Sequence, residues 1–237
     1  MWGLPRIESW RRTVTLLDPD GRMSVSRYIR PRVAHPAHVV EHDGLRLTSV
    51  ARTIVELACT GTLDTALAAA DYALRLRMCS RQEIEDEVAL LSPGIRGRGA
   101  AGLVTDLADG ASGSPAESLS RLQMFRANLP RPRLQQEFWD DAGLIGFSDF
   151  DWDHLIGECD GQSKYNVPEG ASPAEAGDIV WQEKQREDRL RRLKPVARWT
   201  WTTATSTAAL ARHLLSFGLR PEPTSTWIDL GRRPEAR

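Results

Sequence analysis

The stretch 146–165, GFSDFDWDHLIGECDGQSKY, constrains the fold of this chain most strongly, because it places acidic residues on two short apolar runs. Side chains alternate between the two faces of a strand. Asp149 and Asp151 therefore share one face of the first run. Glu158 and Asp160 likewise share one face of the second. If the runs pair as a hairpin, up to four carboxylates converge on one patch, which is costly unless a cation or a proton neutralises them.

Carboxylate oxygens are hard ligands of the kind that suits Mg²⁺ or Mn²⁺. Such an ion, held by Asp149 and Glu158 and open to solvent, supplies a nucleophilic water and neutralises the charge that develops at a phosphate. The acidic stretch therefore indicates metal-assisted chemistry on a phosphate. The plain alternative is a hairpin with solvated carboxylates. The apolar residues Phe147, Phe150 and Ile156 disfavour that alternative, because they are typical of core strands.

The composition is that of an ordinary soluble globular protein, with 237 residues, 41% hydrophobic and 27% charged. No run of about 18 apolar residues is present, so no membrane span is expected. The N-terminus lacks the apolar core of a secretory signal. Three widely spaced cysteines fit a reducing cytoplasm better than a disulfide scaffold. Because the formal net charge is -1, any contact with nucleic acid needs a local basic patch.

Residues 1–109 are predicted to form a mainly α-helical domain with short strands at 14–17 and 39–40. From residue 47 onward the apolar residues recur with helical spacing. The expected helices run from a cap at Thr48 or Ser49 to Gly61, over 62–77, over 81–91 behind a Ser80–Glu83 capping box, and up to about Asp109.

Residues 110–217 are predicted to form an α/β domain after a GASGS linker at 110–114, and residues 218–237 a flexible C-terminal tail. Ser114 as N-cap and Pro115 at the first helical position begin a helix that carries Glu117. The strand–helix–strand crossover near the end implies a mixed sheet with helices packed on it. The elements expected after this helix are a strand at 133–139, the acidic hairpin, a helix at 177–193, a strand at 196–201 and a helix at 207–217.

Four short motifs follow the helix of Glu117: SDF at 148–150, GECDG at 157–161, EKQREDRLRRL at 183–193 and ARWTW at 197–201. Their order and spacing, over about residues 112–215, resemble the PD-(D/E)XK nuclease superfamily, and more narrowly the very-short-patch-repair-like endonucleases of an actinobacterial group. The resemblance implies a restriction-endonuclease-like αβββαβ domain that hydrolyses DNA with Mg²⁺ or Mn²⁺ as cofactor. It also implies that Asp149 and Glu158 hold the metal, and that Glu117 is an accessory acid that orients a water.

The superfamily pattern places a lysine two residues after the metal-binding glutamate, where this chain has Asp160. Lys164 lies just past the strand. Lys184 lies on the following helix, on the same face as Asp188 and Arg191 by their spacing. A cation from this helix would replace the missing one, and without it the domain would bind DNA without cutting. The residues predicted to act in catalysis are Glu117, Asp149, Glu158, Asp160 and Lys184, with Asp160 alternatively a turn residue.

The predicted nucleic-acid contacts are Lys164, Arg191 and Arg198, whose cations would meet backbone phosphates. The segment 197–201 and Trp181 either offer an aromatic face to bases or pack as core residues. RNA is the remaining alternative to DNA as substrate.

The run GLRLTSVARTIVELA, 44–58, resembles the equivalent segment of AbiEi-type antitoxins of type IV toxin–antitoxin systems. Those regulators usually begin with a winged-helix DNA-binding head, and the opening MWGLPRI is similar to the point just after such a head ends. The resemblance implies an alternative function, a non-catalytic antitoxin-like regulator that binds DNA or a partner. The helices of residues 1–109 would then form a packing or partner-binding module.

Overall fold

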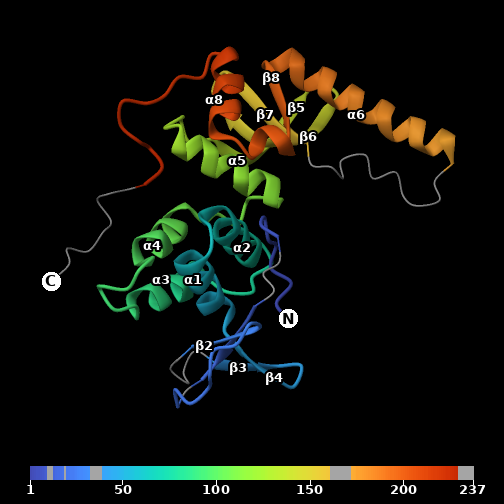
Figure 1. The fold of residues 1–237 in the computed structure, drawn as a ribbon. Coiled ribbons are helices and arrows are strands. Elements are labelled where there is room, and N and C mark those ends of the chain that lie inside the picture. Colours follow the sequence, from blue (N-terminus) through green and yellow to red (C-terminus); the bar gives the residue numbers. More distant parts are fainter. Residues whose placement is uncertain (10–12, 19, 33–38, 161–171, 229–237) are drawn as a thin grey trace. The chain divides into compact units, whose positions relative to one another are not determined.

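The computed structural model describes residues 1–9, 13–18, 20–32, 39–160 and 172–228 (Figure 1). The chain divides into two compact units, Met1–Ala108 and Asp109–Arg237, which combine helices with short sheets. The mixed α/β class expected from the sequence is confirmed. No helix among the described residues is long and apolar enough to cross a membrane.

The described residues of unit 1 include four short strands in two separate sheets. β1 (Val14–Leu17) pairs in parallel with β2 (Ile29–Arg32), and β3 (Val39–His42) pairs antiparallel with β4 (Leu45–Thr48). The expected strands at 14–17 and 39–40 are confirmed. β2 and β4 are additional. The Asp-Gly pair between β3 and β4 predicts this hairpin in retrospect, because both residues have the positive φ that a two-residue type I′ turn requires.

The other regular elements described in unit 1 are helices, and local capping chemistry fixes where two of them begin. The Ser49 hydroxyl accepts a hydrogen bond from the Arg52 amide, and Ser80 and Glu83 form the expected capping box. The core between the helices is made of small and branched apolar side chains, including Ile54, Leu67 and Val104. The helices are α1 (Val50–Thr60), α2 (Leu63–Arg75), α3 (Arg81–Ala89) and α4 (Arg98–Leu107).

Unit 2 is built on a mixed four-stranded sheet with the order β5-β6-β7-β8, as expected from the crossover in the sequence. The first three strands are antiparallel neighbours. β7 and β8 are parallel, and α6 (Pro173–Leu193) connects them. The strands are β5 (Arg133–Asp140), β6 (Gly143–Trp152), β7 (Leu155–Asp160) and β8 (Val196–Thr200).

Helices cover both faces of this sheet (Figure 1). On one face α5 (Pro115–Arg126) packs with α7 (Trp201–Ala204) and α8 (Thr207–Ser216), and the indole of Trp199 donates a hydrogen bond to Ser120 of α5. On the other face Leu190 of α6 joins an apolar cluster with residues of the sheet. The sheet residues of that cluster are Phe138, Ile145, Ile156 and Val196.

Two boundaries in unit 2 differ from the sequence prediction. α6 begins at Pro173 rather than at 177, because Ser172 and Glu175 form a capping box with the proline at the first helical position. The core of unit 2 extends past residue 217, where the sequence predicts a flexible tail to begin, because the described residues 218–228 include a buried tryptophan. Trp227 is only 2% exposed there, because its ring contacts Phe125 and its indole donates a hydrogen bond to a backbone carbonyl.

Candidate active site: buried carboxylates of α5, β6 and β7

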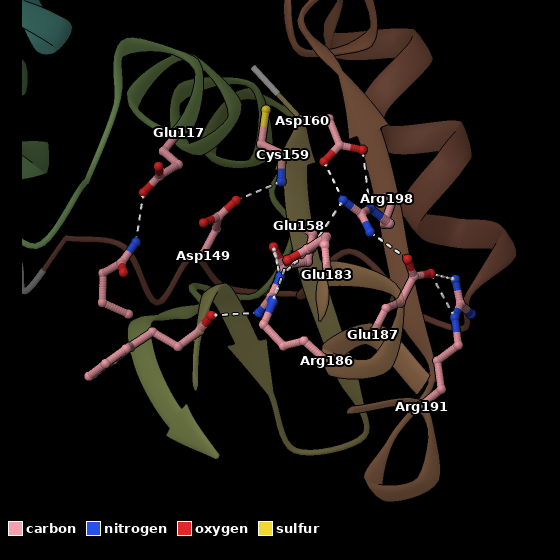
Figure 2. Close-up of polar contacts among 12 residues, drawn as sticks. Glu117, Asp149, Glu158, Cys159, Asp160, Glu183, Arg186, Glu187, Arg191 and Arg198 are labelled. Carbon is pink, nitrogen blue, oxygen red and sulfur yellow. Dashed lines mark hydrogen bonds and ion pairs between the residues drawn. The ribbon is translucent and has the colours of Figure 1, made fainter. Parts of the chain in front are cut away.

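Asp149 lies at an irregular point of the sheet. The regular pairing of β6 with β7 runs from Phe150, opposite Gly157, toward the hairpin turn, so Asp149 lies just beyond it. On the other side Gln135 of β5 has a φ of 48°, which strand residues rarely adopt. The Asp149 carboxylate accepts a hydrogen bond of 2.8 Å from the Cys159 amide (Figure 2). The break in the ladder thus gives this carboxylate a backbone partner on β7.

Glu117 enters the site from the first turn of α5, where Ser114 is the N-cap as expected. Its buried carboxylate accepts hydrogen bonds from the Gly113 amide at 2.7 Å, the Ser114 hydroxyl at 2.9 Å and the Gln135 amide group at 3.0 Å. Burial, and after it the negative charge of Asp149, raise the pKa of Glu117 to about 7, although the three hydrogen bonds lower it. Glu117 and Asp149 therefore form one electrostatic group.

Glu158 of β7 is 2% exposed, and its carboxylate lies 3.4 Å from a guanidinium nitrogen of Arg186 on α6. The same guanidinium donates two hydrogen bonds of 2.9 Å to Glu183 and one of 3.1 Å to the carbonyl of Phe147. Arg186 was not predicted from the sequence. Once Leu190 is known to face the sheet, helical spacing predicts that Arg186 faces it too, because residues four apart share a face of a helix.

Asp160 contacts a cation of the protein itself. Arg198 of β8 donates two hydrogen bonds to its carboxylate, at 3.1 and 2.7 Å, and a third of 2.5 Å to Glu187. Glu187 also accepts two hydrogen bonds from Arg191, at 2.8 and 2.6 Å. Arg191 and Arg198, predicted to contact nucleic acid, are thus joined with Glu187 and Asp160 in one ion-pair network (Figure 2).

Arg186, and not the predicted Lys184, is the cation of α6 that contacts Glu158. Lys184 is exposed, and it lies about 200° around the helix axis from Arg186, two residues away. Its expected neighbours Asp188 and Arg191 are also exposed, so this face of α6 is turned to solvent. Lys164 lies outside the described residues.

The convergence of four carboxylates on one patch is also wrong. Asp151 is buried, but it binds Lys194 at 2.6 Å and Arg133 at 2.6 Å instead of joining Asp149. The physical reason is that Lys194 and Arg133 already neutralise the charge of Asp151. The structure brings together Glu117 and Asp149, with Glu158 beside them on the neighbouring strand (Figure 2).

The donor chemistry of this region fits Mg²⁺ or Mn²⁺, because three buried carboxylates supply hard oxygen atoms. Within the described part of the chain, however, no three His, Cys, Asp or Glu side chains already form a ligand set for a metal ion. Asp149 is turned toward Cys159 and Glu117, whereas Glu158 is turned toward Arg186. A cation held by Asp149 and Glu158 would therefore have to compete with a contact inside the protein.

Comparison with known proteins leaves the activity open. No family model matches the chain, and no solved structure matches it. Two proteins of Mycobacterium tuberculosis, one from strain CDC 1551 / Oshkosh and one from strain H37Rv, are each 38% identical to it over 141 residues, and both are named only as uncharacterized proteins. The match covers 59% of this chain and 51% of each relative, so the chain spans about half the length of the curated relatives it matches.

Proposed function

We propose that this protein is a metal-dependent endonuclease that hydrolyses DNA, with a C-terminal domain of the restriction-endonuclease-like PD-(D/E)XK type. One observation carries the proposal: Glu117 and Asp149 are both buried, and burial, and after it the negative charge of Asp149, raise the pKa of Glu117 to about 7. Buried carboxylates that repel each other in this way are relieved by a cation or a proton. The succession α5-β5-β6-β7-α6-β8 supports the fold, because it follows the order that the superfamily resemblance implies.

In this proposal Asp149 and Glu158 hold Mg²⁺ or Mn²⁺, and Glu117 positions the attacking water. When bound, the ion neutralises charge at the scissile phosphate and makes a water more acidic. Glu117 would accept a proton from the attacking water at its carboxylate, and a pKa of about 7 suits a general base at neutral pH. Its hydrogen bonds to Gly113, Ser114 and Gln135 fix its orientation.

Arg186 takes the role that the superfamily pattern gives to a lysine at the position of Asp160. Its guanidinium is the helix cation beside Glu158, and guanidinium groups bind phosphate oxygens well. Asp160 then acts at a distance from the phosphate. By binding Arg198, which also binds Glu187 of α6, it holds the helix that carries Arg186.

The test is nicking of supercoiled DNA by the full chain in Mg²⁺ or Mn²⁺. Glu158→Gln should reduce nicking to the background of the assay, because it removes a metal-binding carboxylate with little change of shape. Asp153→Asn is the matched control, since Asp153 lies on the same hairpin, is 91% exposed and pairs with Arg133. It should nick as the wild type does. Wild-type protein that cuts neither DNA nor RNA with either ion would refute the nuclease.

A second candidate, the non-catalytic antitoxin-like regulator, is favoured by the contacts of Glu158 and Asp160. Arg186 and Arg198 already provide positive charge to these acids, and no lysine occupies position 160. Such a protein would bind DNA, or a partner protein through the helices of unit 1, without cutting. The double variant Asp149→Ala/Glu158→Ala distinguishes the two candidates, because a regulator would keep its DNA affinity and its biological effect.

Either function is proposed to operate in the cytoplasm. All three cysteines lie in the described residues, and none of them forms a disulfide. A chain without disulfides suits a reducing compartment, where intracellular DNA is also found.

A further inference from the structure

The guanidinium of Arg186 contacts two carboxylates in unequal ways. Its contact with Glu158 is a single one of 3.4 Å. Its contact with Glu183 is two-pronged, with both hydrogen bonds at 2.9 Å, and the Phe147 carbonyl accepts a further bond at 3.1 Å. Two-pronged bonds between arginine and a carboxylate are the stronger kind. Arg186 is therefore held mainly by Glu183 and the Phe147 carbonyl, and its contact with Glu158 is the longest of the three.

The two carboxylates also differ in their need for a cation. Glu158 is 2% exposed, so its negative charge requires positive charge nearby, whereas Glu183 is 36% exposed and water can solvate it. A divalent ion at Glu158 would interact with this charge more strongly than the 3.4 Å contact of the Arg186 guanidinium does. Arg186 can give up that contact and keep its other bonds.

Arg198 and Asp160 form a structural ion pair in the same region. It has two hydrogen bonds, at 3.1 and 2.7 Å, and Arg198 holds Glu187 at 2.5 Å as well. Breaking it would free α6 from two strands. The contact between Arg186 and Glu158 lacks this multiplicity, which is typical of an exchangeable contact.

We infer that Arg186 is an internal counter-ion of Glu158 that competes with a divalent cation for this carboxylate. The inference rests on the proposed function, since it needs a cation site at Asp149 and Glu158. In the free protein Arg186 neutralises Glu158. When a cation arrives, Arg186 leaves Glu158 and stays bound to Glu183, and the released N–H groups are available to a phosphate oxygen. The site therefore binds metal less tightly than its carboxylates alone would allow.

The test is the affinity of the full chain for Mn²⁺ without DNA, measured from the electron paramagnetic resonance signal of free Mn²⁺. Arg186→Met should bind Mn²⁺ about tenfold more tightly or better, within the usual range of coupling between two competing ligands. Glu183→Gln should bind it more weakly, because Arg186 then loses its anchor and turns fully to Glu158. This second variant alters a half-exposed side chain, so the inference can be tested even if Arg186→Met does not fold.

Arg189→Met is the matched control, since it removes the same charge from the same helix. Arg189 binds Asp140 and the carbonyls of Gly143 and Leu144 instead, so Mn²⁺ affinity should not change. Tightening by Arg189→Met equal to that by Arg186→Met would refute competition at Glu158. So would a wild type that binds Mn²⁺ and an Arg186→Met variant that binds it no better, which leaves the proposed nuclease intact. Absence of Mn²⁺ binding from every variant would refute both proposals, whereas binding by Arg186→Met alone would support the inference.

Discussion

Asp151 and Glu158 are both 2% exposed and lie on neighbouring strands, yet the protein neutralises them differently. Asp151 binds the Lys194 ammonium at 2.6 Å and the Arg133 guanidinium at 2.6 and 2.9 Å. The Arg186 guanidinium meets Glu158 through one contact, which is 3.4 Å long. The first carboxylate joins three parts of unit 2 through two cations. The second is held loosely by a cation whose stronger bonds go elsewhere.

This difference separates a structural carboxylate from the one that we propose to bind a metal ion, although both look alike in the sequence. A carboxylate that already holds two cations at short range has no capacity for a metal ion. A carboxylate with one long contact can exchange its partner at low cost. Burial alone therefore does not identify a site, and the number and length of the charged contacts decide between the two roles.

The largest expected effect is on stability, when Asp151 is changed to Asn. Breaking a buried ion pair costs about 3–5 kcal/mol, and we expect about 2–3 kcal/mol here because Lys194 and Arg133 both reach water. Glu158→Gln should cost less than about 1 kcal/mol, since its contact with Arg186 is long and Arg186 keeps its bonds to Glu183 and Phe147. The free energy of unfolding in urea measures both. Equal losses in the two variants would contradict the distinction between them.

A third carboxylate, Glu117, sharpens the comparison, because neutral donors rather than cations hold it. Its pKa of about 7 lies above the ordinary 4.5, so the folded state keeps a proton that the unfolded state releases between these values. The free energy of unfolding should therefore fall as pH rises from 4.5 to about 7, by on the order of 2 kcal/mol, and level off above. Glu117→Gln should flatten this slope in urea titrations across that pH range.

The proton that Glu117 keeps below pH about 7 also predicts how Mn²⁺ binding depends on pH. A cation that requires the ionised carboxylate of Glu117 must displace the proton, so the Mn²⁺ affinity of the wild type should rise up to pH about 7 and then level off. Asp153→Asn, on the exposed hairpin turn, should keep the pH dependence of the free energy of unfolding and that of the Mn²⁺ affinity. A wild-type slope that survives in Glu117→Gln would show that another group titrates.

Much of the fold could be predicted from local chemistry in the sequence. The caps at Ser49, Ser80 and Ser114 mark three helix starts, because each involves residues only a few positions apart. Two four-residue strands of unit 1 were missed, since such short and partly exposed strands show little alternation. The burial of Trp227 could not be predicted, because this side chain packs against residues about a hundred positions earlier in the chain.

The site was predictable as a set of acids but not as a geometry. Residue type and spacing indicated Asp149 and Glu158, and the resemblance to the PD-(D/E)XK superfamily implied Glu117. The positive φ of Gln135 could not be inferred, because no glycine or asparagine marks that position. The choice of Arg186 over Lys184 depends on which face of α6 packs on the sheet. That face is set by contacts with β6 and β7 rather than by the helix sequence alone.

The smallest effect is expected for Arg191, a predicted nucleic-acid contact that lies in the network of Glu187. Arg191 is half exposed and spans four residues to Glu187, so Arg191→Met should lower the free energy of unfolding by about 0.3–0.5 kcal/mol. Because Glu187 already balances its charge, DNA affinity and its dependence on salt should change little. If Arg191 instead contacts a phosphate, the slope of log affinity against log salt falls by about one in the variant. A filter-binding titration at several salt concentrations separates these outcomes. A slope that falls by one unit in Arg191→Met would identify Arg191 as a phosphate contact.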